Sequence, residues 1–187
     1  MEHKGTVALE TERLILRRFR EEDAQIMFDN WVSNPNVTKY ITWQTHGSVE
    51  TTKAVIGEWI KKYQIPNYYQ WAIELKEIGQ AIGSISVVRI NERVESCEVG
   101  YCIGERWWKQ GITTEAFKRV IEFLFEELQA NSIRAGHDTE NPGSGCVMQK
   151  CGLVYEGTLR QAGKNNKNAL CDLAIYAILR EDFVNIR

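Results

Sequence analysis

The sequence predicts a mixed α/β fold of the α+β type, with a mainly antiparallel central sheet of about six to seven strands and about four flanking helices. Segments of alternating apolar residues are joined by short polar turns, as in antiparallel strands. Segments with apolar residues at every third or fourth position lie between groups of these strands. Because the 187 residues include only three prolines and no repeat, we expect one domain over residues 1–187.

The N-terminal third is expected to hold one strand and two helices. Alternation over residues 13–19 predicts the first strand, and apolar spacing over 21–32 predicts a helix. The run Asn34-Pro35-Asn36 should end that helix. Ser48 can cap a second helix, whose apolar face continues to Tyr63.

The remaining elements follow in the order three strands, helix, strand, helix, two strands. Turns at 76–79 and 91–93 separate the strands 70–75, 81–90 and 96–103. Apolar residues at every fourth position from 112 to 128 predict a long helix over 113–129. The last expected elements are strand 133–137, helix 143–150, and strands 153–162 and 169–179 around a polar turn.

Composition excludes several classes of protein. The net charge of −2 argues against a dedicated nucleic-acid binder, which usually carries a basic face. No apolar run approaches the ~20 residues of a membrane span, and the N-terminal stretch lacks a signal-type apolar core, so we expect a cytoplasmic protein. The five cysteines include no CxxC pair, so we expect buried thiols in a reducing compartment and no metal site.

The stretch ERWWKQGITTEAFKRV, residues 105–120, is a candidate anion site. The first N–H groups of a helix have no intrahelical partners and carry partial positive charge, so a glycine-containing turn before a long helix can hold a phosphate. Gly111 would allow close approach, Thr113 and Thr114 would add hydroxyls, and Lys109 would add charge. From this stretch alone, an ordinary helix start with Thr113 as cap is an equally good interpretation.

With the elements in this order, the chain resembles the GNAT superfamily of acetyl-CoA-dependent N-acetyltransferases, and within it the RimJ/RimL-like branch. The resemblance runs over about residues 9–183 and is carried by TERLILRRF, SCEVGYCIGERWWKQGITTEA, ENPGSGCVMQKCGLVYEGTLR and the closing strand. It implies one GNAT-like domain whose sheet contains a splayed pair, strand 96–103 and strand 133–137.

The resemblance also implies how acetyl-CoA is bound. The family pattern Gln/Arg-x-x-Gly-x-Gly/Ala places the pyrophosphate on the candidate loop; Gly111 matches it, whereas Trp108 and Thr113 depart from it. Pantetheine is expected along strand 98–103 as an added strand, with Asn141 as a further partner. The implied cofactor-binding residues are Val99, Gly100, Tyr101, Ile103, Trp108, Lys109, Gln110, Gly111, Ile112, Thr113, Thr114, Asn141 and Ser144.

Two residues are implied as catalytic. Glu98 matches a strand position where some members carry a base that works through water, although a strand carboxylate in an ion pair is the ordinary alternative. Ser144 matches a serine proposed to protonate the leaving thiol, with capping of helix 143–150 as its alternative. The acceptor side is expected to include Trp31, Tyr40, Trp43 and His46. Core packing is the alternative for the aromatic residues and the favoured one for Trp31, and an ordinary surface-loop histidine is the alternative for His46.

The expected activity is direct acetyl transfer to a primary amine, without a metal or a covalent enzyme intermediate. A protein N-terminal α-amine of ribosomal-protein type is the first expected acceptor. A free small amine, such as an amino acid, a polyamine or an antibiotic, is the second. A non-catalytic acyl-CoA-binding module is the alternative from another class. We expect no direct nucleic-acid or membrane partner, and a monomer or homodimer.

Overall fold

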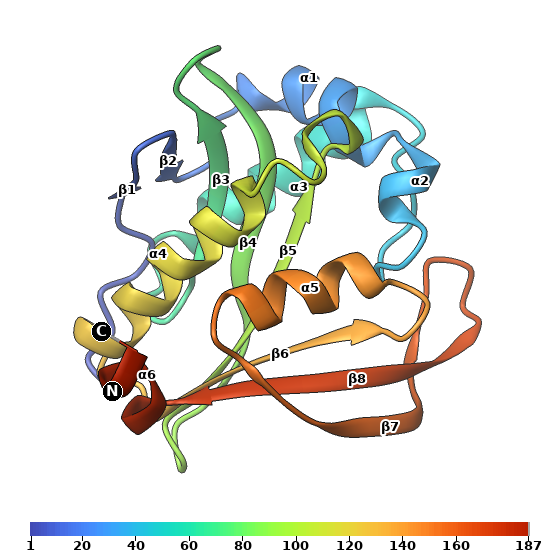
Figure 1. The fold of residues 1–187 in the computed structure, drawn as a ribbon. Helices are drawn as coiled ribbons and strands as arrows, with labels where there is room; N and C mark the ends of the chain where they lie inside the picture. Colours follow the sequence, from blue (N-terminus) through green and yellow to red (C-terminus); the bar gives the residue numbers. More distant parts are fainter. Residues whose placement is uncertain (187) are drawn as a thin grey trace.

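The computed structural model describes residues 1–186 and contains one eight-stranded sheet with helices on both faces (Figure 1). The strands are β1 (Leu9–Glu10), β2 (Leu14–Arg17), β3 (Gln70–Leu75), β4 (Gln80–Asn91), β5 (Ser96–Ile103), β6 (Ser132–Asp138), β7 (Val154–Lys164) and β8 (Leu170–Leu179). The α-helices are α1 (Asp23–Met27), α2 (Pro35–Thr38), α3 (Val49–Lys62), α4 (Ile112–Glu126), α5 (Pro142–Lys150) and α6 (Arg180–Ile186). A π-helical turn, η1 (Phe28–Val32), continues α1, and a 3₁₀ turn, η2 (Glu105–Trp107), precedes α4.

The sheet order is β1-β2-β3-β4-β5-β6-β8-β7. Every neighbouring pair is antiparallel except β5 and β6, which are parallel and pair only where Ser96–Glu98 faces Ser132–Arg134. Beyond Glu98 the two strands part, and the halves of the sheet open like a V (Figure 1). This is the predicted splayed pair in a mainly antiparallel sheet.

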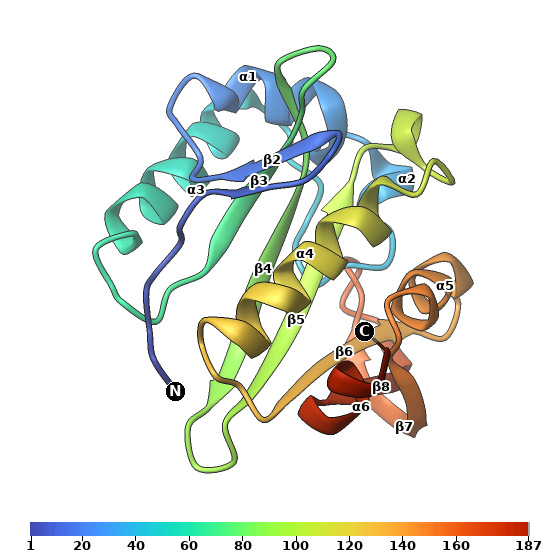
Figure 2. The ribbon, with the colours of Figure 1, turned by 60° about the vertical axis from the view of Figure 1, so that its left-hand side comes forward.

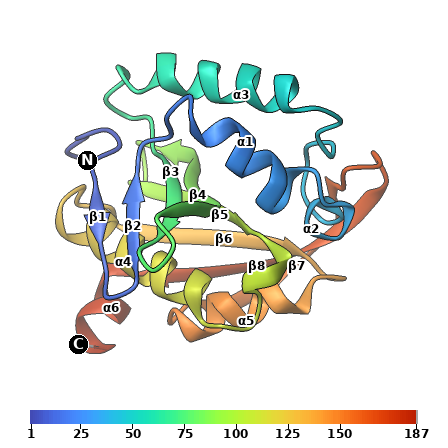
Figure 3. The same cartoon turned by 90° about the horizontal axis from the view of Figure 1, so that it is seen from above.

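Each face of the sheet has its own apolar core. Helices α1 and α3 cover one face, and α4 and α5 cover the other (Figure 3). The α4 core is the larger and includes buried Phe117, Val120 and Leu124. Figure 2 shows α4 crossing over β4 and β5, which places its N-terminal end beside the end of β5. The layers therefore bring the predicted anion loop to the mouth of the β5–β6 opening.

Several short elements differ from the sequence expectation. The sheet has eight strands because a two-residue strand, β1, pairs with β2. Asn34-Pro35-Asn36 ends the first helix but also starts α2, since the Asn34 side chain accepts from the N–H of Asn36. Helix α4 ends at Glu126, three residues early, because the N–H groups of residues 127 and 128 both donate to the carbonyl of Phe123.

Candidate active site

The opening between β5 and β6 exposes one edge of β5. The N–H of Gly104 donates to the carbonyl of Ile82 in β4 at 2.9 Å. Backbone groups of successive strand residues point to alternate sides, so those of Val99, Tyr101 and Ile103 point toward the opening. The Ile103 carbonyl already accepts from Trp108 Nε1 at 3.0 Å. The N–H of Val99 closes the last pairing with β6, at Glu98 and Arg134, so the Val99 carbonyl and the backbone of Tyr101 present the free edge on which an extended ligand can pair.

The loop after β5 presents a row of N–H donors. Gly111 is the N-cap of α4, with φ +75° and ψ 0°, and Lys109 also lies in the left-handed region at φ +61°. No acceptor within residues 1–186 receives a hydrogen bond from an N–H of residues 109–114. Thr113 does not cap α4, which was the alternative considered from the sequence. The N-cap residue is Gly111, and no side chain within residues 1–186 makes a capping hydrogen bond there. The geometry therefore favours an anion site over an ordinary helix start.

Arg13, in the turn before β2, braces this loop from one side. Its Nη1 donates to the carbonyl of Gln110 at 3.1 Å, and its Nε donates to the carboxylate of Glu115 at 2.6 Å. Glu115 also accepts from the Thr11 hydroxyl at 2.6 Å. Hydrogen bonds from Thr11 and Arg13, opposed by partial burial, leave the pKa of Glu115 lowered. An ionised Glu115 thus joins the first turn of α4 to the β1–β2 turn.

Glu105 braces the loop from the opposite side. Its carboxylate accepts from the side-chain amides of Asn34 at 2.7 Å and Asn36 at 3.2 Å, and these bonds lower its pKa. Gly104 before it has no room for a side chain, since a Cβ would lie 2.4 Å from the Asn30 carbonyl oxygen. The loop is therefore fixed to η1 and α2 as well as to β2.

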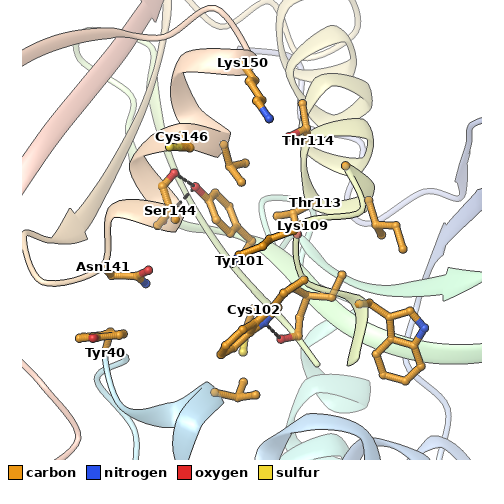
Figure 4. A pocket seen from close by; sticks show the side chains of 18 of the residues that line it. Tyr40, Tyr101, Cys102, Lys109, Thr113, Thr114, Asn141, Ser144, Cys146 and Lys150 are labelled. Atoms are coloured by element: carbon orange, nitrogen blue, oxygen red, sulfur yellow. Dashed lines mark hydrogen bonds between the residues drawn. The ribbon is translucent and has the colours of Figure 1, made fainter. Parts of the chain in front are cut away.

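A cavity of about 540 Å³ lies between the loop, α5 and α2. Its walls include eleven residues predicted from the sequence to contact cofactor or acceptor: Tyr40, Tyr101, Ile103, Trp108, Lys109, Gly111, Ile112, Thr113, Thr114, Asn141 and Ser144. Figure 4 shows Lys150 and Thr114 on facing helices at one end, and Asn141 near Tyr40 at the other. The loop that could donate hydrogen bonds to a phosphate and the start of α5, which carries the Ser144 hydroxyl, thus line the same cavity.

The start of α5 contacts β5 through Tyr101 and Ser144 (Figure 4). The Ser144 hydroxyl donates to Tyr101 Oη at 3.0 Å, and the Tyr101 hydroxyl donates to the Ser144 carbonyl at 2.9 Å. Ser144 therefore does not cap α5, which was the alternative considered from the sequence. Asn141 is the N-cap residue of α5, and its side chain makes no capping bond in the described chain.

Glu98 lies at the closed end of the opening and not on the cavity wall. It is the last residue of β5 that pairs with β6, opposite Arg134. Its side chain is 38% exposed and lies 3.6 Å from Arg89 Nη1, so the ion pair considered from the sequence is present. Cys97 and Val99 on either side belong to the α4 core, so Glu98 points to the opposite face of the sheet.

The predicted acceptor-side residues fall into two groups. Tyr40 lines the cavity. Trp31 is completely buried in the core beneath α1 and α3, so its placement at an acceptor cleft is wrong. Trp43 packs against that core and stands 5.5 Å from the ring of His46. His46 Nδ1 bonds the Thr52 hydroxyl at 2.8 Å, and burial lowers its pKa. Neither lines the cavity.

Sequence reasoning missed several cavity residues. Lys150 and Cys146 lie on α5, and Asn36, Val37 and Ile41 come from α2 and the segment after it. A signal existed for Lys150, because positions 143, 147 and 150 share a helical face and Gly143 is only two residues after Asn141. The α2 residues carried no such signal, since their contact with the loop depends on folding.

Residues 1–186 contain neither a candidate metal cluster nor a candidate membrane-spanning helix. No group of three or more histidine, cysteine, aspartate or glutamate side chains is placed to hold a metal ion in this part of the chain. None of its helices combines the length and the apolar character needed to cross a membrane.

Comparison with known proteins identifies relatives of the whole fold. Residues 13–154 match the acetyltransferase (GNAT) domain family. An uncharacterised N-acetyltransferase of Bacillus subtilis, YoaA, is 31% identical over 172 residues, covering 92% of this chain and 96% of the relative. The ribosomal protein uS5 alanine N-acetyltransferase of Escherichia coli is 25% identical, covering 81% and 80%.

Among solved structures, RimL, a ribosomal L7/L12 α-N-protein acetyltransferase in complex with coenzyme A, superposes with a TM-score of 0.82. It shares 19% sequence identity, and the match covers 92% of this chain and 98% of that one. At this level of identity the likeness concerns the fold.

Proposed function

The chain belongs to the GNAT acetyltransferase family, and from this premise we propose that it transfers the acetyl group of acetyl-CoA directly to a protein N-terminal α-amine. The observation that carries the proposal is the row of six unpartnered N–H groups, residues 109–114, at the mouth of the opened β5–β6 pair. A phosphate-binding helix start beside a free strand edge suits a ligand that is anionic at one end and peptide-like along its length.

Acetyl-CoA would lie with its pyrophosphate on this loop and its pantetheine arm along β5. Lys109 and Lys150 on the cavity wall bring positive charge to the phosphate end. The amides of the arm would pair with the Val99 carbonyl and with the backbone groups of Tyr101, and Asn141 would offer its side-chain amide from the other wall. Ile103 would contribute less to pairing with the arm, because its carbonyl already accepts a hydrogen bond from the Trp108 indole.

Acetyl transfer then needs only modest chemistry from side chains. The neutral amine attacks the thioester carbonyl, the C–S bond breaks, and its electron pair stays on sulfur. We propose that Ser144 gives its hydroxyl proton to that sulfur and recovers one from water, and that Glu98 takes the amine's excess proton through water. The exposure of Glu98 beside the start of the opening supports this route. Alignment of both substrates in one cavity supplies much of the rate.

The choice of an N-terminal α-amine rests on what the relatives acetylate. The relative from Escherichia coli and the RimL structure are both named for ribosomal-protein N-terminal or alanine acetylation. An α-amine has an ordinary pKa near ~7.7–8.0, so much of it is neutral at physiological pH and demands little from a base.

Thiol release from acetyl-CoA across a panel of acceptors tests the proposal. The panel pairs N-terminal peptides with the same peptides blocked at the α-amine, alongside free amino acids, polyamines and aminoglycosides. Release that requires a free peptide α-amine supports the proposal. Release with small amines alone assigns the free-amine activity instead, and CoA binding without release from any acceptor assigns a binding module.

A further inference from the structure

We propose that Tyr101 positions the Ser144 hydroxyl against the thiol of coenzyme A, acting through Ser144 and not as an acid itself. This inference rests on the proposed function. It starts from one observation: a single phenol oxygen on β5 bonds both the side chain and the backbone of one residue on α5 (Figure 4).

The direction of the two hydrogen bonds is fixed by chemistry. The Ser144 carbonyl can only accept, so the bond at 2.9 Å uses the single proton of Tyr101. The bond at 3.0 Å must then use the proton of Ser144, with Tyr101 Oη as acceptor. Tyr101 therefore determines where the Ser144 proton points.

Without Tyr101, the Ser144 proton has a competing acceptor. Serine hydroxyls in helices commonly donate to a backbone carbonyl three or four residues earlier. For Ser144 that places the proton on the carbonyl of Asn141 or Glu140, just before α5 begins. A thiolate attracts a hydroxyl proton more strongly than a neutral phenol oxygen does. The bond to Tyr101 thus holds the proton in a place from which sulfur can take it.

Tyr101 is poorly suited to be the acid. Its own proton is held by the Ser144 carbonyl, and burial raises its pKa above the ordinary value of 10.0. Its ring packs against Phe117 of α4 with centroids 5.4 Å apart, which anchors the phenol to a second helix. These features suit a fixed support.

The position of Tyr101 in β5 links this support to the cofactor. Its backbone faces the opening where the pantetheine arm is proposed to pair, and its side chain holds the serine. The distance from the thiol to Ser144 Oγ is then set through one residue. Binding the arm in register on β5 therefore places the sulfur near the Ser144 proton.

A set of variants assayed at saturating acceptor tests this role. Tyr101→Phe keeps the ring against Phe117 and removes both hydrogen bonds. We expect kcat to fall roughly tenfold, the factor that ~1.4 kcal/mol produces, while KM for acetyl-CoA changes less than about threefold. The matched control is Tyr68→Phe, another tyrosine with a raised pKa, whose ring packs on Tyr63 and lies outside the cavity. It should leave both constants unchanged.

The background variants separate positioning from packing. The Ser144→Thr variant keeps a hydroxyl at this position. Adding Tyr101→Phe to it should therefore lower kcat by the same roughly tenfold factor as in the wild type. Ser144→Ala has no hydroxyl to position, so adding Tyr101→Phe to it should lower kcat no further. The comparison remains valid if one Ser144 variant is less stable, because kcat with and without Tyr101→Phe is compared within the same Ser144 variant.

Other results overturn the inference. These are an unchanged kcat in Tyr101→Phe, an effect confined to KM, an unchanged kcat in Ser144→Ala, or an equal loss from Tyr101→Phe in the Ser144→Ala background. Turnover on a small amine alone would refute only the N-terminal acceptor, and the ratios would be measured with that amine. Absence of turnover with every acceptor would refute the proposed function and this inference with it.

Discussion

Gly111 is the position where one added methyl group should separate cofactor binding from folding. Its backbone lies at φ +75°, which alanine adopts only at a cost of roughly 1–2 kcal/mol. The space itself is not limiting, because a Cβ there would lie 3.7 Å from Arg13 Nη2, an ordinary contact. Gly111→Ala therefore tests the backbone conformation alone, because the added Cβ makes no steric clash.

The surroundings of Gly111 decide where this cost appears. The residue is exposed, so an alanine in the free protein can relax the turn by giving up the bond from Arg13 to the Gln110 carbonyl, which rotates the N–H groups of residues 109–114 away from the cavity. Acetyl-CoA must then restore the left-handed conformation on binding. A cost of roughly 1–2 kcal/mol corresponds to a Kd about 5- to 30-fold higher.

Gly79→Ala is the matched control. Gly79 has φ +62°, a Cβ there would meet nothing within 4 Å, and the residue lies in the tight β3–β4 turn far from the cavity. Its N–H donates to the carbonyl of Leu75 at 2.9 Å, so relaxation would break the turn. The same strain should therefore lower Tm by about 2–8 °C and leave CoA affinity unchanged.

Calorimetric titration with CoA and thermal melting of both variants provide the two measurements. We expect weaker CoA binding in Gly111→Ala alone, and the clearer loss of Tm in Gly79→Ala. Wild-type affinity in Gly111→Ala would show that the loop's donors do not hold the phosphates. An equal loss of affinity in both variants would show that affinity follows general stability.

Three further predictions concern other parts of the molecule. Gly145→Ala would place a Cβ 2.7 Å from His137 Nε2, so it should cost about 1–3 kcal/mol and lower Tm; adding His137→Ala should cost less than the sum of the single changes. Cys146 is exposed and lines the cavity, so CoA should slow its alkylation, as followed by mass spectrometry. Burial raises the pKa of Cys97 from 9.0 to about 12, so its contribution to stability is full below pH 9 and is lost as pH rises toward 12. Cys97→Ala should flatten the fall of Tm over that range.

The sequence predicted best those elements whose apolar residues repeat over several turns or strand positions. Helix α4 and the strands β3 to β6 follow such patterns, whereas the splayed pair was expected only from the resemblance to the GNAT superfamily. Strand β1 and helix α2 are too short to show a period. They form because β2 and the Asn34 side chain supply partners, which only the folded chain provides.

Site residues were predictable where one segment carries the information. The donor row at residues 109–114 is such a local feature, whereas Asn141 was expected at the site only from the resemblance, because its own segment reads as a turn; both lie at the cavity or its mouth. Trp31 was assigned to the acceptor side because the first two helices line that cleft in the family, although core packing was the favoured alternative, and its complete burial agrees with that alternative. The Tyr101–Ser144 contact joins residues 43 positions apart, so no local pattern could indicate it.

Trp108 shows why a departure from a family pattern need not remove the function. The pattern places glutamine or arginine there, and the structure turns the indole back to the Ile103 carbonyl at 3.0 Å. The side chain thus ties the loop to the strand that precedes it. Since phosphate contacts can come from backbone N–H groups, the position is free to serve the loop's shape. Conformation at Gly111 and Lys109, together with this tie, aims the donors at the cavity.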